Sequence, residues 1–143
     1  MASLGAIAWH YSERAVSVMR KPRILLVEDT PDTPEFMQLL LESSGFVVVS
    51  REDGAEALSF LSQDKPDIIL TDLMMPNVSG IELIEEVRSN SVLSNIPIIA
   101  MTAFSSGPIA KAMEAGANAI VKKPGGIETL VSTVRQLLPA GPV

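Results

Sequence analysis

Polar side chains with the chemistry of phosphoryl transfer follow four apolar segments of this sequence. They are Glu28 and Asp29, then Thr71 and Asp72, then Thr102, and finally Lys122 and Lys123. Crowded carboxylates repel one another, and one lysine does not balance three of them, so the group needs a further cation. Hard oxygen ligands suit Mg²⁺. A carboxylate nucleophile beside a divalent ion, an ammonium and a hydroxyl fits aspartyl-phosphate chemistry, because phosphoryl transfer requires mainly positioning and charge neutralisation.

Elements that position these residues are visible in the apolar pattern from Arg23 onward. Five short runs rich in branched residues predict strands at 24–27, 47–49, 68–70, 96–101 and 119–121. Helical spacing between and after them is shown by Phe36/Leu39/Leu40, Ala57/Leu58/Leu61, Ile81/Ile84/Val87, Ile109/Ala112/Met113 and Ile127/Leu130/Val131/Val134/Leu137/Leu138.

This strict alternation predicts an α/β fold with a parallel sheet that is buried by helices on both faces. Right-handed crossovers favour a doubly wound open sheet, for which the flavodoxin-like strand order 2-1-3-4-5 is one common solution. Ligands of such sheets bind at the carboxyl ends of the strands. The polar residues above stand at those ends.

Composition narrows the class of protein. The chain has 143 residues with 47% hydrophobic content, which suits one globular domain. Its formal net charge of -6 argues against direct binding to nucleic acid. The absence of Cys fits a reducing compartment, and no apolar run reaches the roughly 20 residues of a membrane helix. No secretory signal pattern is evident, so a cytoplasmic protein is expected.

Several motifs in order resemble the receiver domains of two-component response regulators, which are CheY-like in fold. The matching stretches are 24–29 (ILLVED), 66–76 (PDIILTDLMMP), 79–80 (SG), 96–103 (IPIIAMTA), 115–117 (AGA) and 123–124 (KP). Together they extend from Arg23 to about Leu138. The resemblance implies a five-stranded doubly wound sheet of order 2-1-3-4-5 and a stand-alone signalling domain.

The resemblance also implies a role for each site residue. Asp72 is the phospho-acceptor, Thr102 bonds the phosphoryl group and Lys123 pairs with it. Mg²⁺ is held by Glu28, Asp29, Asp72 and the backbone carbonyl of Met74. The donor is a histidine kinase or a histidine phosphotransfer protein, and the output goes to a separate, unknown protein target. The domain catalyses its own phosphorylation and dephosphorylation, as a signalling switch rather than a metabolic enzyme.

Two assignments have alternatives. Glu28 and Asp29 also fit the solvated cap of a helix that begins near Pro31. Lys122 and Lys123 compete for one role, since side chains on a strand alternate between faces and only one of the two can reach the site. The family pattern places the lysine directly before proline, which selects Lys123.

The sequence departs from the family pattern at positions that, in the family, pass the effect of phosphorylation to a partner protein. Ile120 stands where most receivers carry an aromatic switch residue, and Gly125-Gly126 replaces the usual packing anchor after the Lys-Pro pair, giving the loop more backbone freedom. These departures keep a second hypothesis open, a constitutive interaction module that does not depend on phosphorylation. A phosphatase with an aspartyl nucleophile is disfavoured, because Met74 stands where such enzymes carry a second Asp.

The predicted domain organisation is an N-terminal extension at 1–21, a receiver domain at 22–139 and a short tail at 140–143. Apolar residues of the extension recur at helical spacing, namely Leu4, Ile7, Ala8, Tyr11, Ala15 and Val18. Three interpretations compete: an over-long start with Met19 as the natural beginning, a mobile arm, or a helix that docks on a partner or a second copy. We expect a monomer or a weak dimer.

Overall fold

The computed structural model describes residues 20–29, 33–75, 77–103, 107–123 and 126–139. Its strands are β1 (Arg23–Val27), β2 (Val47–Arg51), β3 (Ile68–Asp72), β4 (Ile98–Thr102) and β5 (Ala119–Lys122). Its helices are α2 (Thr33–Ser43), α3 (Gly54–Leu61), α4 (Gly80–Ser89), α5 (Gly107–Ala115) and α6 (Leu130–Leu137), the last preceded by a 3₁₀ turn, η1 (Ile127–Thr129). None of the helices in this described part is long and apolar enough to span a membrane.

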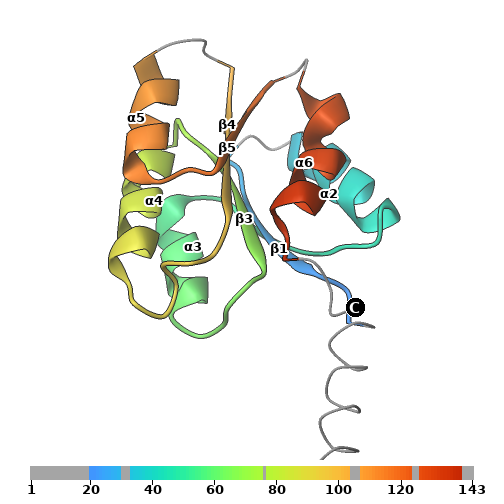
Figure 1. Ribbon diagram of the computed structural model, residues 1–143, viewed down its shortest axis with the longest axis horizontal. Helices are drawn as coiled ribbons and strands as arrows, with labels where there is room; N and C mark the ends of the chain where they lie inside the picture. The colour runs from blue at the N-terminus through green and yellow to red at the C-terminus, as the bar shows by residue number, and fades with distance from the viewer. Residues whose placement is uncertain (1–19, 30–32, 76, 104–106, 124–125, 140–143) are drawn as a thin grey trace, which may run out of the picture.

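The five strands form one parallel sheet in the order β2-β1-β3-β4-β5. Helices α3, α4 and α5 cover one face of the sheet, and α2 and α6 cover the other (Figure 1). Each parallel pair requires a crossover connection, which the helices supply. The predicted doubly wound sheet, with order 2-1-3-4-5 and helices on both faces, is confirmed.

Side chains of β1 point alternately to the two faces of the sheet, so this one strand contributes to two apolar clusters. Leu25 and Val27 belong to the apolar cluster under α3, α4 and α5, whereas Ile24 and Leu26 belong to the cluster under α2 and α6. All four side chains are fully buried. A strand with helices on both sides needs apolar residues at every position, which is why it appears in the sequence as a continuous apolar run.

The buried face of α2 differs from the one that the predicted spacing indicated. Phe36 and Leu39 are 61% and 65% exposed, while Met37 and Leu41 are fully buried. The helix carries apolar residues around much of its circumference, so hydrophobicity alone does not orient it. The contact of α2 with the sheet decides that Met37 and Leu41 face the core.

Strand β4 begins two residues later than predicted. The Ile96 N–H donates to the Leu93 carbonyl at 3.0 Å, so Ile96 closes a turn although its side chain is buried. Pro97 has no N–H, but its carbonyl accepts from the Ile69 N–H at 3.0 Å. Regular pairing with β3 then starts at Ile98. An apolar run indicates which residues are buried, and buried residues can extend beyond the strand that pairs with its neighbours.

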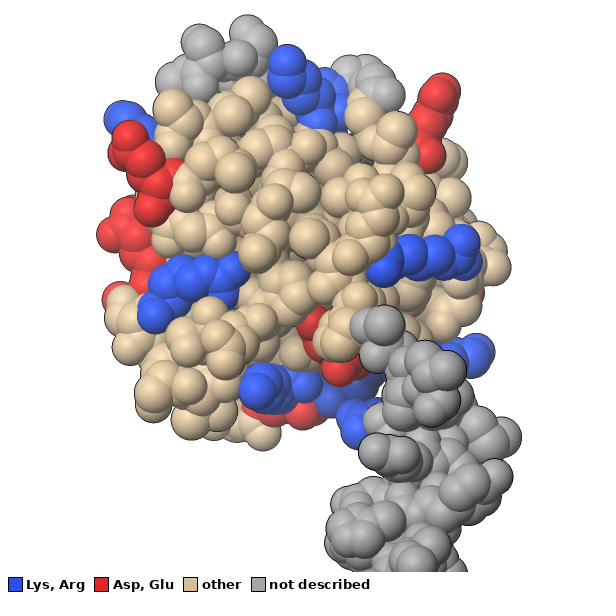
Figure 2. Space-filling view, viewed as in Figure 1, with Lys and Arg blue, Asp and Glu red and all other residues tan. Residues whose placement is uncertain are grey.

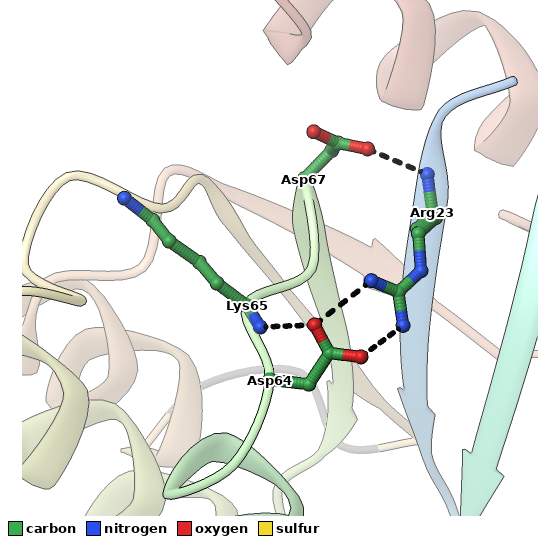
Figure 3. A network of polar contacts seen from close by, with 4 residues as sticks. All are labelled: Arg23, Asp64, Lys65 and Asp67. Atoms are coloured by element: carbon green, nitrogen blue, oxygen red, sulfur yellow. Dashed lines mark hydrogen bonds and ion pairs between the residues drawn. The ribbon is translucent and has the colours of Figure 1, made fainter. Parts of the chain in front are cut away.

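A polar network holds the N-terminal ends of β1 and β3 together (Figure 3). The Arg23 guanidinium donates to Asp64 Oδ1 and Oδ2 at 2.9 and 2.6 Å, and the Arg23 N–H donates to Asp67 Oδ2 at 2.7 Å. The hydrogen bond from Arg23, with a second from the Lys65 N–H, lowers the pKa of Asp64 to about 2. Because Asp64 is exposed, this pair orients the loop before β3 more than it stabilises the fold.

Arg88, in the last turn of α4, joins two loops that lie beside β4 and β5. Its Nε donates to the Gly116 carbonyl at 3.0 Å, and Nη1 donates to the Ser94 and Ile96 carbonyls at 3.0 and 2.8 Å. Nη2 donates to Asn118 Oδ1 at 2.8 Å. One planar guanidinium therefore satisfies four oxygens from the α4–β4 and α5–β5 connections.

We expect Arg88→Ala to lower the free energy of unfolding by about 2–3 kcal/mol, because partly buried carbonyls lose a charged donor. Arg88→Lys should recover little of this, since an ammonium lacks the planar fork of donors. Arg135→Lys is the control, because Arg135 is exposed and makes one such bond, to the Ser44 carbonyl at 3.0 Å. Urea denaturation measures the three variants, and an Arg88→Lys protein as stable as the unsubstituted chain would contradict the expectation.

Candidate functional site

The register of the sheet brings four of its strands to one edge at nearly the same level. Val27 pairs with Thr71, Asp72 with Met101, and Thr102 with Lys122. Residues that follow these positions therefore lie side by side across β1, β3, β4 and β5. Hydrogen bonding extends one residue beyond β1, since the Glu28 N–H donates to the Arg51 carbonyl at 3.1 Å.

Three carboxylates converge at this edge. One oxygen from each of Glu28, Asp29 and Asp72 lies within 4.8 Å of the others. Glu28 and Asp72 are buried, at 2% and 8% exposure, whereas Asp29 is exposed. The predicted acidic residues are thus brought together, with two of them inside the molecule and one at the mouth of the site.

Lys123, and not Lys122, reaches the carboxylates. The Lys123 Nζ lies 2.7 Å from Glu28 Oε1 and 3.3 Å from Asp72 Oδ2, while the Lys122 side chain is exposed. The Lys123 N–H donates to the Thr102 carbonyl at 2.8 Å, which fixes the backbone where β5 ends. Burial lowers the pKa of Lys123, but the hydrogen bond to Glu28 and the charge of Asp72 outweigh it, so the pKa is raised and the ammonium stays charged.

The remaining predicted residues lie in the same region. Thr102 ends β4 and is 1% exposed, so its hydroxyl is inside the molecule beside the strand that carries Asp72. Met74 follows β3, with a side chain that is 58% exposed. Gly125 lies outside the described residues.

Glu28 has one carboxylate oxygen that a further cation could bind. Its Oε1 is paired with Lys123, but Oε2 is buried with no hydrogen-bond partner among the described residues. Burial raises the pKa of Glu28 to about 7, the Lys123 hydrogen bond opposes this rise, and the charge of Asp72 adds to it. A buried carboxylate oxygen without a donor, next to two further carboxylates, is the donor set that a divalent ion with oxygen ligands would satisfy. The residues present therefore fit Mg²⁺.

Gly80 has a structural role at the site, because the backbone of Asp72 and Leu73 leaves no space for a side chain there. Gly80 is the first residue of α4, and its φ is not positive. A Cβ at this position would stand 2.1 Å from the Asp72 carbonyl oxygen and 2.8 Å from the Leu73 Cα. The Gly80 N–H also donates to the Leu73 carbonyl at 3.0 Å. Gly80 is therefore required for space, and it supports the backbone of Asp72.

Gly126, at the other side of the site, also lies close to neighbouring backbone atoms. The Gly125-Gly126 pair suggested added backbone freedom. A Cβ on Gly126 would instead stand 2.5 Å from the Lys122 carbonyl oxygen and 3.1 Å from Val121 Cγ1. The loop after β5 packs closely on that strand at this point. Sequence alone shows only the absence of a side chain, which freedom and close packing both require.

Ile120 lies on the face of the sheet covered by α3, α4 and α5. It is partly buried and packs against the apolar cluster on that side, which includes Ala100, Ala112 and Ala117. An aliphatic side chain in this place has no polar group to guide it toward solvent. The sequence-based expectation that Ile120 alters how phosphorylation is coupled to this face stays a prediction.

Known proteins share this arrangement. A family model for the response regulator receiver domain matches residues 24–135. The polar-differentiation response regulator DivK of Brucella anthropi is 31% identical over 116 residues, which are 80% of this chain and 94% of DivK. Hybrid signal transduction histidine kinase D of Dictyostelium discoideum is 37% identical over 123 residues, but the chain spans only 8% of that protein.

A solved structure extends the comparison to the metal. The receiver domain of a sensor histidine kinase from Pseudomonas aeruginosa PAO1 has a magnesium ion coordinated in its active site cleft. It matches with a TM-score of 0.77 at 29% identity, over 82% of this chain and 98% of that one. Receiver domains take phosphoryl groups from histidine kinases and bind Mg²⁺ at their acidic cleft. From its sequence match, its sheet order and its converging carboxylates, the chain belongs to the family of response regulator receiver domains.

Proposed function

We propose that this chain is a response regulator that accepts a phosphoryl group on Asp72 from a histidine kinase or a phosphotransfer protein. It then signals to a separate protein through a conformational change. The observation that carries the proposal is the position of the Lys123 ammonium, 2.7 Å from Glu28 and 3.3 Å from Asp72. This places a fixed positive charge beside a buried carboxylate at the edge where a donor can approach.

In the proposed reaction a carboxylate oxygen of Asp72 attacks the phosphorus of the donor. The new P–O bond forms as the bond between phosphorus and the donor nitrogen breaks, and the electron pair leaves with the donor. Lys123 neutralises charge on the transferred group, and the Thr102 hydroxyl donates a hydrogen bond to one of its oxygens. Hydrolysis of the acyl phosphate returns the carboxylate of Asp72.

Glu28, Asp29, Asp72 and the backbone carbonyl of Met74 are the groups that would hold Mg²⁺. When bound, the ion supplies charge neutralisation to the phosphoryl oxygens. Glu28 contributes the buried oxygen that has no hydrogen-bond donor among the described residues. Lys123 keeps the other oxygen of Glu28 oriented.

Magnesium binding should depend on pH through Glu28. Because the pKa of Glu28 is about 7, binding below that pH must release its proton, so we expect the affinity for Mg²⁺ to fall about tenfold per pH unit from 7 to 5. In the metal-free protein a raised carboxyl pKa stabilises the fold below the ordinary value of 4.5, and this contribution is lost as pH rises through 7. Thermal denaturation with and without Mg²⁺ should therefore show the larger metal-induced rise in Tm at pH 8.

Glu28→Gln separates this effect from other titrations. The amide is close in shape but has no proton to release, so we expect weaker binding of Mg²⁺ whose affinity changes little between pH 5 and 7. Glu35→Gln, on the exposed first turn of α2, is the control and should behave like the unsubstituted chain. Equal pH dependence in the Glu28→Gln protein would show that Glu28 is not the titrating ligand.

Phosphorylation by a small-molecule donor tests the proposed function. We expect incubation with acetyl phosphate and Mg²⁺ to add one phosphate by intact mass, and a chelator to prevent the addition. The other candidate is a receiver-fold interaction module that does not use phosphate, which the departures at Ile120 and Gly125 keep in view. An unmodified mass across pH, donor and metal conditions would favour that module.

The surface charge of the chain indicates which class of partner to expect. Figure 2 shows one face of the molecule, which is mostly uncharged; Lys and Arg side chains are scattered over it, and those that lie near one another at its lower edge have Asp and Glu side chains beside them. Binding to a phosphate backbone requires clustered cations, and the formal net charge of the chain is -6, so we propose protein partners rather than nucleic acid. We further propose a monomer or weak dimer in the cytoplasm, a location that suits a chain without Cys.

A further inference from the structure

The connection between β3 and α4 is a loop whose two ends are fixed. The Leu73 N–H donates to the Met101 carbonyl of β4 at 3.1 Å, and the Leu73 carbonyl accepts from the Gly80 N–H at 3.0 Å. Met74, whose carbonyl is one of the groups that would hold Mg²⁺, is the first residue after Leu73. The direction of that carbonyl therefore depends on how the rest of the loop is held.

Asn77, inside this loop, has a left-handed backbone. Its φ is +67°, and no other non-glycine residue in the described part of the chain has a positive φ. Residues other than glycine reach this region at a cost, which is lowest for Asn and Asp and high for β-branched residues. The Asn77 side chain is exposed, so its burial does not offset the cost. A strained residue persists only where its neighbours hold it, and such residues gather at functional sites.

Val78, the next residue, packs against the beginning of α3. Gly54 is the first residue of α3 and is buried. A Cβ on Gly54 would stand 2.5 Å from the Val78 carbonyl oxygen, and 2.7 and 2.8 Å from Val78 Cγ1 and Cβ. The main chain and the side chain of Val78 therefore both lie against a surface that only glycine leaves open. This contact fixes the loop directly after its strained residue.

The segment between β2 and α3 contacts two of the loops that carry metal-binding groups. Arg51, the last residue of β2, accepts a hydrogen bond from the Glu28 N–H at 3.1 Å. Gly54, shortly after it, contacts the loop that begins with Met74. Glu28 and Met74 are far apart in sequence, and this one segment supports the backbone near both of them.

We propose that the contact between Gly54 and Val78 holds Asn77 in its left-handed conformation and so positions the Met74 carbonyl for Mg²⁺. Gly54 and Val78 are positioning residues, because neither offers a side-chain ligand to the ion. When the contact is lost, the strained backbone relaxes, and the loop with the Met74 carbonyl moves relative to the carboxylates. The proposal rests on the metal site of the proposed function and does not depend on phosphate transfer.

Substitutions at Asn77 test the backbone conformation apart from side-chain contacts. Glycine accepts a positive φ without strain, whereas valine is almost excluded from it. In the full chain we expect Asn77→Val to weaken Mg²⁺ binding about tenfold, as for a group that orients a metal ligand, and Asn77→Gly to leave it nearly unchanged. Mg²⁺ titration followed by the amide chemical shifts of the isotope-labelled protein measures the dissociation constant of the folded chain. Equal dissociation constants in the two variants would refute the role of the backbone.

Substitutions at the contact test its link to α3. Gly54→Ala should weaken Mg²⁺ binding because the added methyl pushes Val78 away. Val78→Ala leaves the space empty, so it should fold even where Gly54→Ala does not, and we expect it to weaken binding several-fold. The double variant Gly54→Ala/Val78→Ala should bind better than either single variant, since the added methyl takes the space that Val78 gives up.

Gly45→Ala is the control for loss of stability without a change at the loop. Gly45 has a φ of +100° and no atom within 4 Å of a Cβ, so its substitution should lower Tm but leave the Mg²⁺ dissociation constant unchanged. Equal losses of Mg²⁺ affinity in Gly45→Ala and Gly54→Ala would overturn the positioning role, as would a double variant that binds more weakly than both single variants. An unsubstituted chain that binds no Mg²⁺ would instead overturn the metal site itself.

Discussion

The Asp72→Asn protein is expected to take up no phosphate from acetyl phosphate and Mg²⁺, under conditions that modify the unsubstituted chain. The amide has nearly the shape of the carboxylate but is not a nucleophile, so acyl phosphate cannot form. Asp72 is 8% exposed and lies 3.3 Å from the Lys123 Nζ, where an amide oxygen can still accept a hydrogen bond. The fold should therefore persist while the adduct disappears. Intact mass measures the adduct, and thermal denaturation verifies the fold.

Asp67→Asn is the matched control for this loss. Asp67 precedes the same strand but lies at its other end, exposed, where Oδ2 accepts from the Arg23 N–H at 2.7 Å. An amide oxygen can keep that bond. We expect this variant to be phosphorylated like the unsubstituted chain. A phosphate that remains in the Asp72→Asn protein would mean a different acceptor and would remove the basis of the proposed reaction.

The Gly80→Ala protein is expected to lose about 3 kcal/mol or more of its free energy of unfolding, with a fall in Tm of about 10 °C. A Cβ at position 80 would stand 2.1 Å from the Asp72 carbonyl oxygen and 2.8 Å from the Leu73 Cα, both backbone atoms next to β3. Backbone paired in a central strand cannot move aside cheaply, so α4 or the end of β3 must shift. Urea and thermal denaturation measure the loss.

Gly45→Ala separates lack of space from backbone strain. Gly45 has a φ of +100° but no atom within 4 Å of a Cβ, so its substitution strains the backbone without a clash. We expect it to cost about 1–2 kcal/mol. The order of the two effects is the test: a Gly80→Ala protein as stable as Gly45→Ala would show that α4 can adjust. If Gly80→Ala remains folded, its rate of phosphorylation should also fall, because the displaced backbone carries Asp72.

The sequence by itself determined the strands, their order along the chain and the residues that would meet. Each of the runs 24–27, 68–70 and 119–121 is apolar at every position because helices cover both faces of the sheet. Parallel strands end at a common edge, so polar residues just after them must converge whatever the details of packing. The choice of Lys123 over Lys122 followed from alternation and the family pattern, and the structure places Lys123 at the carboxylates.

The tertiary structure alone decided features that depend on distances between elements far apart in sequence. The side of α2 that faces the core, Met37 with Leu41, depends on how the helix lies on the sheet, since its other side is also apolar. The need for Gly80 depends on the approach of α4 to the Asp72 backbone. The unequal distances of Lys123 from Glu28 and Asp72 depend on loops that no local pattern encodes. Local sequence specifies periodicity and polarity, whereas these contacts arise only when separate elements share one space.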